Sequence, residues 1–273
     1  MFGSILKGAL SQARYFGRFW LSILRYRYYL RQAVARDVRK RYKRSVMGYF
    51  WSMLNPLLMM LILTAVFSAI MKRPAKDYAV FLLCGLLPWE FFSSTISQSL
   101  SAIRAHMNII LQVPVPKYIF LLAIAISNLT TFMLSLGALL LVMIITGAPF
   151  YWSMLALPLV LLPLFIFAVG MCTLFAVANV FFEDTTHLTG VILRGMYFLC
   201  PIIYSRDRLP ENLVRWLALN PIFEQIEFMH GLFGAGALPD TQVYLVNVGV
   251  SLAVLYAGLW VFRRAEDKFI YFM

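Results

Sequence analysis

The sequence predicts an all-α membrane protein with six transmembrane helices, and three observations support this prediction. Of its 273 residues, 62% are hydrophobic and only 13% are charged, whereas soluble domains are about 45–50% apolar and about 25% charged. The apolar runs are long and continuous, which favours helical spans over the alternating strands of a barrel. Positive charge gathers at one end of the chain. We expect one transmembrane domain over residues 1–273, with an N-terminal interfacial helix and two short outer helices between spans five and six.

The charge distribution sets the expected orientation of the chain. Twelve of the 24 Lys and Arg residues precede Ser45, and Asp37 is the only acid among them. The net charge is +12, but such uneven placement argues against a nucleic-acid partner. On a membrane protein it follows the positive-inside rule and places the N-terminus in the cytoplasm. Six spans then return the C-terminus to the same side.

Residues 16–44 are predicted to form an amphipathic helix. Apolar side chains recur every three or four positions as one helical stripe, and most of the basic side chains lie off it. The stripe consists of Phe19, Ile23, Tyr26, Leu30, Val34, Val38 and Tyr42. An aromatic-rich face with a basic remainder is typical of a helix that lies in the membrane interface. A solvated, positively charged leader is the alternative interpretation.

The spans follow from uncharged runs of sufficient length. Residues 45–71 contain 27 uncharged positions, and residues 118–182 contain 65, which is too long for one span and enough for two joined by a tight turn. The six predicted spans cover 50–71, 78–101, 118–146, 152–182, 188–203 and 241–262.

Residues 205–233 break this regular pattern. They contain two short amphipathic pieces separated by Asn220-Pro221, and both pieces are too short and too polar to span. We predict two outer gate helices, re-entrant or at the surface, because irregular backbone at membrane depth must pack against protein or line a watery cavity.

The sequence offers little for catalysis. It contains no Gly-rich loop ending in Gly-Lys-Ser/Thr for ATP, and its three histidines lie in different loops without metal-ligand spacing. We therefore predict no catalytic residue, no metal site and no cofactor bound by this chain.

Two charged residues, Glu90 and Arg194, fall inside predicted spans. Intramembrane charge is costly and usually functional. Either the two residues pair with each other, or they make polar contacts on a transport path, or they lie near an interface. Aromatic clusters flank both, and aromatic faces stack against sugar rings. The predicted path residues are Trp89, Glu90, Phe91, Phe92, Tyr197 and Tyr204.

Six short motifs occur in a specific order along most of the chain. The first runs from Arg36 to Trp51, followed by Leu54 and Pro56. The others are Gly85–Phe92, Val113–Lys117, Phe182–Asp184, Tyr197–Tyr204 and Leu219–Pro221. This ordered set resembles the permease subunits of ATP-binding-cassette (ABC) exporters of polysaccharides, which include the O-antigen, capsule and teichoic-acid export permeases. Glu90 departs from the pattern, because family members often carry a neutral polar residue there.

The resemblance implies a transport subunit rather than an enzyme. Two copies would form a homodimeric channel in the bacterial cytoplasmic (inner) membrane, and two cytoplasmic ATPase subunits would supply the ATP and Mg sites. The substrate would be a polyprenyl-pyrophosphate-linked, O-antigen-like glycan in contact with membrane lipids. The alternatives are a wall teichoic acid exporter, a drug or lipid ABC exporter, an ion-coupled secondary transporter and a membrane-embedded glycan-processing enzyme.

The resemblance also suggests two groups of site residues. Basic residues would form the substrate entrance: Arg36, Arg39, Lys40, Arg41, Lys43 and Arg44. Cytoplasmic residues would couple the chain to the ATPase: Arg104, His106, Asn108, Val113, Pro114, Lys117, Asp184 and His187.

Overall fold

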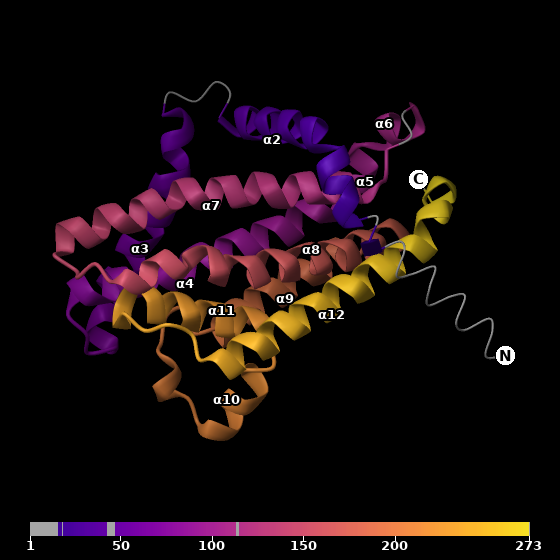
Figure 1. Ribbon diagram of the computed structural model, residues 1–273. Helices are drawn as coiled ribbons and strands as arrows, with labels where there is room; N and C mark the ends of the chain where they lie inside the picture. The colour runs from indigo at the N-terminus through magenta and orange to yellow at the C-terminus, as the bar shows by residue number, and fades with distance from the viewer. Residues whose placement is uncertain (1–15, 18, 43–46, 113–114, 273) are drawn as a thin grey trace.

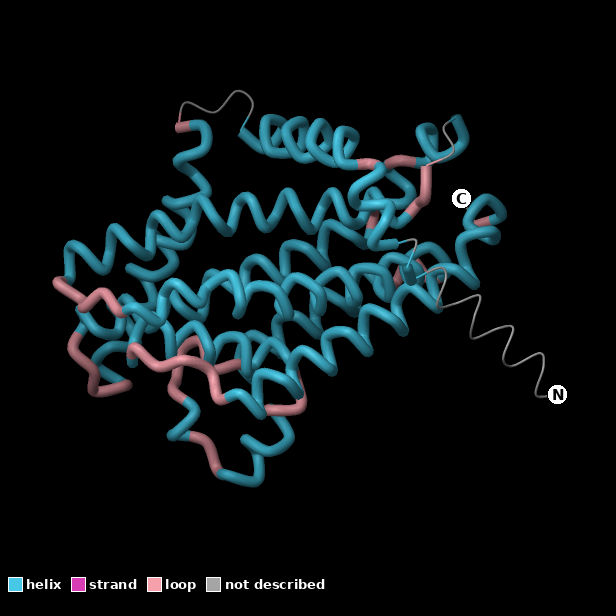
Figure 2. Tube along the Cα trace, viewed as in Figure 1, coloured by secondary structure: helices cyan, strands magenta, loops and turns pink. Residues whose placement is uncertain are grey.

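A computed structural model describes residues 16–17, 19–42, 47–112 and 115–272. These residues form helices and connecting loops and contain no strand (Figures 1 and 2). Together with the long apolar helices, this confirms the predicted all-α membrane class.

The long helices are separated by short helical turns. In order, the elements are α2 (Arg27–Tyr42), η1 (Gly48–Phe50), α3 (Trp51–Ile70), α4 (Ala75–Leu100), α5 (Ala102–Ala105), α6 (Met107–Gln112), α7 (Tyr118–Thr146), η2 (Trp152–Ala156), α8 (Leu157–Phe181), α9 (Thr185–Leu199), η3 (Arg206–Arg208), α10 (Glu211–Leu217), α11 (Pro221–His230), η4 (Gly231–Ala235), α12 (Thr241–Ala265) and η5 (Glu266–Tyr271).

Within the described residues, five helical stretches are long and apolar enough to cross a membrane. They are Gly48–Ile70, Ala75–Leu100, Tyr118–Thr146, Trp152–Phe181 and Thr241–Phe269. These stretches correspond to the first four predicted spans and the sixth.

The predicted fifth span, 188–203, differs from its counterpart in the structure. Helix α9 has 15 residues, or about 22 Å at 1.5 Å per residue, which is shorter than the ~30 Å hydrocarbon core of a bilayer. The helix ends because Cys200 is extended, the conformation favoured before the proline at position 201. The count of six spans therefore stays a prediction.

Helix α4 lies at the centre of the bundle. It packs against α3, α7, α8 and α11, and Figure 1 shows α4, α7, α8 and α12 running alongside one another. Its apolar window is 78% buried, against 17% for the stretch that contains α3. A helix that is apolar all round can be covered on every side by neighbouring helices, whereas the outer face of α3 is left for lipid or for another chain.

Helices α8 and α12 cross at two glycines. A Cβ atom added at Gly258 would lie 2.6 Å from the carbonyl oxygen of Gly170 and 2.1 Å from the hydroxyl oxygen of Thr173. Small residues at such crossings let helix backbones approach closely, which strengthens packing where the hydrophobic effect does not act between helices.

The N-terminal segment is helical, but it is not the single helix predicted over 16–44. A turn at Tyr26 separates helical residues 19–25 from α2. Leu30 and Val38 from the apolar stripe are buried, and the rings of Tyr29 and Phe120 lie 5.9 Å apart, so the stripe packs against α7 of the same chain. A position in the membrane interface stays a prediction.

The predicted outer segment, 205–233, contains one exposed helix and one enclosed helix. Helix α10 buries none of its residues and projects from the bundle at the bottom of the view (Figure 1). Helix α11 is enclosed, with Ile222, Phe223 and Ile226 fully buried, and it packs against α4 and α8. It begins at a capped proline, because the side chain of Asn220 accepts a hydrogen bond from the amide of Ile222 at 3.3 Å.

The glycine crossing yields a stability prediction. Gly258→Ala should lower the midpoint of thermal unfolding in detergent, because the added methyl group forces α8 and α12 apart at a cost of about 1–3 kcal/mol. Gly249→Ala is the matched control on the same helix, since a Cβ there meets no atom within 4 Å. Removing a helical glycine at an open position should leave stability unchanged or improve it by about 0.5–1 kcal/mol. Equal destabilisation by both variants would contradict the proposed role of the crossing.

Candidate functional site

Two segments that are predicted to be cytoplasmic and to couple to an ATPase meet in the structure. Arg104 of α5 forms an ion pair with Glu183, which lies in the turn between α8 and α9. The Glu183 side chain is largely exposed, so the pair itself contributes at most about 1 kcal/mol. Its main significance is positional, because it joins the α5–α6 segment to the start of α9.

A buried amide strengthens this junction. The side-chain amide of Asn179 donates to the carbonyl of Leu100 at 2.8 Å, and its oxygen accepts from the hydroxyl of Thr186 at 2.7 Å. Asn179 is only 4% exposed, so losing either partner would leave a buried polar group unsatisfied, at about 1–3 kcal/mol. One side chain thus connects the ends of α4 and α8 to the beginning of α9. Sequence reasoning missed it, although an amide near the end of a long apolar run was the available signal.

The other predicted coupling residues divide into anchored and exposed groups. Lys117 donates to the backbone carbonyl of Glu266 and lies 5.4 Å from the ring centroid of Phe269, so it anchors α7 to the C-terminal end of α12. His106 stacks on Phe120 with centroids 4.8 Å apart. The side chains of Asn108, Asp184 and His187 are exposed, and Val113 and Pro114 lie outside the described residues. Contact with an ATPase stays a prediction for all of them.

The basic entrance is only partly described. Arg36 pairs with Asp37, with 3.3 Å between Nε and Oδ1, while Arg39 and Lys40 are exposed on α2. Arg41 belongs to α2, but its side chain lies outside the description, as do Lys43 and Arg44 entirely. The described part therefore presents two unshielded cations at the C-terminal end of α2.

Three rings of the predicted aromatic path are buried within the chain. Trp89, Phe91 and Phe92 are 7%, 3% and 0% exposed, so neighbouring helices of the same chain cover these rings. Trp89 meets Tyr197 of α9 edge-on, with centroids 5.8 Å apart. The Tyr204 hydroxyl donates to the carbonyl of Phe198 at 2.9 Å and braces the end of α9. A role for these rings in lining a path stays untested.

Glu90 and Arg194 do not pair. No ion pair joins them among the described residues, and Arg194 instead donates from Nε to the carbonyl of Gly190 at 3.2 Å. A mutual pair is therefore absent from the part of the chain that the structure describes. Arg194 is exposed on α9, a helix that buries only Thr189 and Leu193.

Glu90 is exposed to a cavity of about 270 Å³ bounded by α3, α4 and α7. The lining combines one carboxylate, several amides and hydroxyls, and three aromatic rings. It consists of Trp51, Ser52, Asn55, Pro56, Leu87, Glu90, Phe91, Ser94, Asn128, Thr131, Phe132 and Ser135. Sequence reasoning identified Glu90, Trp51 and Phe91 but did not place the polar side chains of α3 and α7 around them.

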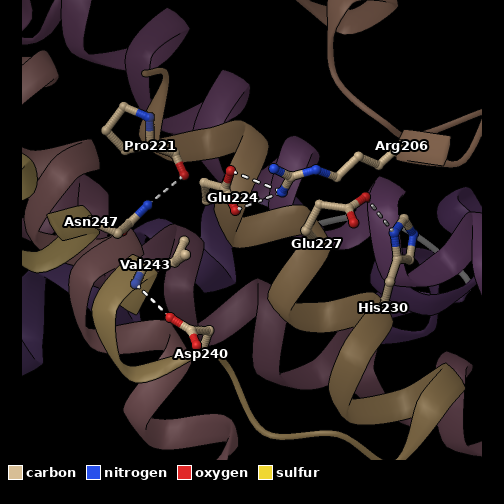
Figure 3. Close-up of polar contacts among 8 residues, drawn as sticks. All are labelled: Arg206, Pro221, Glu224, Glu227, His230, Asp240, Val243 and Asn247. Carbon is tan, nitrogen blue, oxygen red and sulfur yellow. Dashed lines mark hydrogen bonds and ion pairs between the residues drawn. The ribbon is translucent and has the colours of Figure 1, made fainter. Parts of the chain in front are cut away.

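Polar contacts hold α11 within the bundle (Figure 3). Glu224 accepts two hydrogen bonds from Nη1 of Arg206, at 3.2 and 3.4 Å, and its side chain is 6% exposed. Burial raises the pKa of the Glu224 carboxyl, and the Arg206 guanidinium opposes that shift. Asn247 of α12 donates to the carbonyl of Pro221 at 3.0 Å.

A second set of contacts joins α11 to α4. Nε2 of His230 lies 3.1 Å from the carbonyl of Phe81, and its ring stacks on that of Phe81 with centroids 4.0 Å apart. Glu227 lies 3.5 Å from the other ring nitrogen (Figure 3). Polar side chains on both sides therefore hold the enclosed helix of the predicted gate.

Comparison with known proteins places this geometry in a family. The family model of the ABC-2 type transporter matches residues 28–233. The chain is 28% identical to the O-antigen export system permease protein RfbA of Myxococcus xanthus, over 90% of this chain and 96% of that protein. It is also 28% identical to RfbA of Klebsiella pneumoniae, over 86% and 90%, and to the polysialic acid transport protein KpsM of Escherichia coli, over 86% and 92%. Because the family model covers most of its length, the chain belongs to the ABC-2 type transporter family, whose membrane subunits work with an ATPase partner.

Proposed function

We propose that this chain is the channel-forming permease of an exporter that moves polyprenyl-pyrophosphate-linked, O-antigen-like polysaccharide across the bacterial cytoplasmic membrane. The observation that carries the proposal is the match to two kinds of polysaccharide export proteins over nearly their whole length. The KpsM relatives, which are polysialic acid transport proteins 28% and 26% identical to this chain, make a capsule-type polysaccharide the second candidate.

The unburied surface of α9 supports a homodimeric channel. A lone arginine that faces lipid is costly, and Arg194 lies about 15 Å along α9 from the start of the helix at 1.5 Å per residue. Helix α9 also exposes apolar side chains, among them Val191 and Phe198, so much of this helix is uncovered in the single chain. A second copy facing this surface would enclose a hydrated path between two α9 helices.

The cytoplasmic junction supports coupling to a separate ATPase. In this proposal two ATPase subunits hold ATP and Mg and dock on the α5–α6 segment and on the turn before α9, with both chain termini on the same side. Movement of the docked segment reaches α9 through the Arg104–Glu183 pair and the Asn179 contacts. The basic end of α2 would meet the pyrophosphate of the substrate and anionic lipid headgroups, at about 1 kcal/mol per basic residue near the surface.

Reconstitution tests the proposal directly. The permease, co-purified with its ATPase in proteoliposomes, should move fluorescent polyprenyl-pyrophosphate-linked glycan across the bilayer only when ATP is supplied. ATP hydrolysis without any movement of glycan, or movement by the permease alone on an ion gradient, would reject it.

The Asn179 junction predicts a change in coupling. Asn179→Leu should leave ATP hydrolysis by the complex largely intact and lower the export-to-hydrolysis ratio about tenfold, the factor that corresponds to 1.4 kcal/mol. The reason is that motion of the α5–α6 segment no longer passes to α9. Gln32→Leu, which replaces an exposed amide on α2, is the control and should keep the normal ratio. An unchanged ratio in Asn179→Leu would remove this junction from the coupling mechanism.

The α9 surface predicts water access. Arg194→Cys should react with a membrane-impermeant thiol reagent in the assembled transporter, whereas Leu193→Cys, buried beside it, should not. Met133 on α7 is 41% exposed in the chain. Met133→Cys should stay unreactive if that surface faces lipid. The three native cysteines are buried and should give little background. Equal reactivity at positions 194 and 133 would argue against a path along α9.

A further inference from the structure

The cavity between α3, α4 and α7 contains three polar side chains without partners. Neither the Glu90 carboxylate, the Asn55 amide nor the Ser94 hydroxyl has a hydrogen bond or ion pair to another side chain or to backbone within the part of the chain that the structure describes. All three project into the same space. Elsewhere in the lining, polar groups are satisfied internally, as in Ser135, which donates to the carbonyl of Ser52 at 2.7 Å.

Glu90 and Asn55 are exposed to this cavity and Ser94 is half-buried, so all three can bond a polar ligand that enters it. Glu90 lies ten residues before the end of α4, about 15 Å along the helix axis, and charged or amide groups at such depth are costly unless they are paired. The space of about 270 Å³ is several times the ~30 Å³ that a water molecule occupies in the liquid. It therefore has room for a ring-sized polar molecule rather than a single ion.

The lining indicates which class of molecule fits. No Lys, Arg or His lines the cavity, so it does not suit a phosphate. An ionised carboxylate only accepts hydrogen bonds, an amide both donates and accepts, and a hydroxyl does either, and together they match the vicinal hydroxyls of a sugar. Trp51 is 44% exposed and offers a ring face at the same cavity, where a pyranose can stack.

The cavity adjoins the basic end of α2. A second hollow is lined by Val38, Arg39, Tyr49 and Thr130, among others. On α7, Thr130 lines this hollow and the adjacent Thr131 lines the sugar-sized cavity. At the start of the first span, Tyr49 lines the hollow and Trp51 lines the cavity. An exposed cation therefore lies next to a cavity that suits an uncharged ligand, at the point where the first span begins.

From this arrangement we infer that the cavity binds the sugar ring attached to the diphosphate of a lipid-linked glycan. Glu90, Asn55 and Ser94 bond the sugar hydroxyls, Trp51 stacks on the ring, and the diphosphate lies toward Arg39 on α2. The inference rests on the proposed function for its substrate, and it assigns recognition to the lipid-proximal sugar at a site apart from the α9 surface.

Binding of three probes to the purified permease–ATPase complex, followed by native mass spectrometry, tests the inference. The probes are farnesyl diphosphate and two derivatives that carry one N-acetylglucosamine or one galactose. We expect the complex to bind at least one glycosylated probe about tenfold or more tightly than farnesyl diphosphate, as hydrogen bonds to a charged group would give. Glu90→Ala should abolish that preference and leave the affinity for farnesyl diphosphate unchanged. Asn55→Ala should reduce it, and Glu90→Gln should retain part of it.

A control on the same helix separates binding from folding. Ser93 bonds the backbone carbonyl of Glu90 and lies outside the lining, so Ser93→Ala should keep the full preference. Equal binding of all three probes to the unmodified complex, a preference that survives Glu90→Ala, or a loss of affinity for all probes alike would overturn the inference. If glycan transport occurs without any sugar preference, only the inference fails. If the preference depends on Glu90 but no glycan is ever transported, the proposed function fails and the sugar site stands.

Discussion

The burial of α4 is the constraint on which the rest of the structure depends. Between Tyr78 and Phe92 every residue of this helix is buried except Phe81 and Glu90. Helices α3, α7, α8, α9 and α11 pack around it, so their relative positions are set by the shape of one central helix. The two exceptions mark the two places where α4 reaches outside the core. Phe81 contacts His230 of the enclosed outer helix, and Glu90 reaches the cavity beside α3 and α7.

Much of this architecture could be predicted because uncharged runs must match the thickness of a bilayer and basic residues mark the cytoplasmic side. The segments 50–71, 78–101 and 241–262 each correspond to a long apolar helix for that reason. Helix α9 is harder to predict, because hydropathy does not say how a short apolar run will end. Contacts between residues far apart in the chain could not be predicted; Arg104 and Glu183, for example, are separated by 79 positions. Periodicity indicates which face of a helix is buried but not which neighbouring helix covers it.

Composition alone also does not reveal which residues of the candidate site are buried. Aromatic clusters around Glu90 and Arg194 suggested a path, yet the rings of Trp89, Phe91 and Phe92 are covered by the bundle. A helix that is apolar on all sides gives no signal for which aromatic residues belong to the core. Asn55 and Asn179 were inconspicuous in sequence because each is a neutral residue in an apolar run, and Ser94 is one of several Ser and Thr residues near the end of its helix. Their importance comes from packing, which brings each beside groups from two other helices.

The size of the cavity bears on how an exporter handles a long polymer. A space of about 270 Å³ accepts a sugar ring but not a chain, so any tight recognition there is confined to the lipid-proximal end of the glycan. Conduction demands the opposite along the rest of the path, because a site that binds each passing unit strongly would hold it there. Recognition beside α2 and passage along α9 therefore call for separate surfaces. In our proposals these surfaces are the Glu90 cavity and the exposed face of α9, and α4 contacts both α3 and α9. Occupancy of the Glu90 cavity can thus influence α9 through a buried helix, without any ligand contact to the path itself.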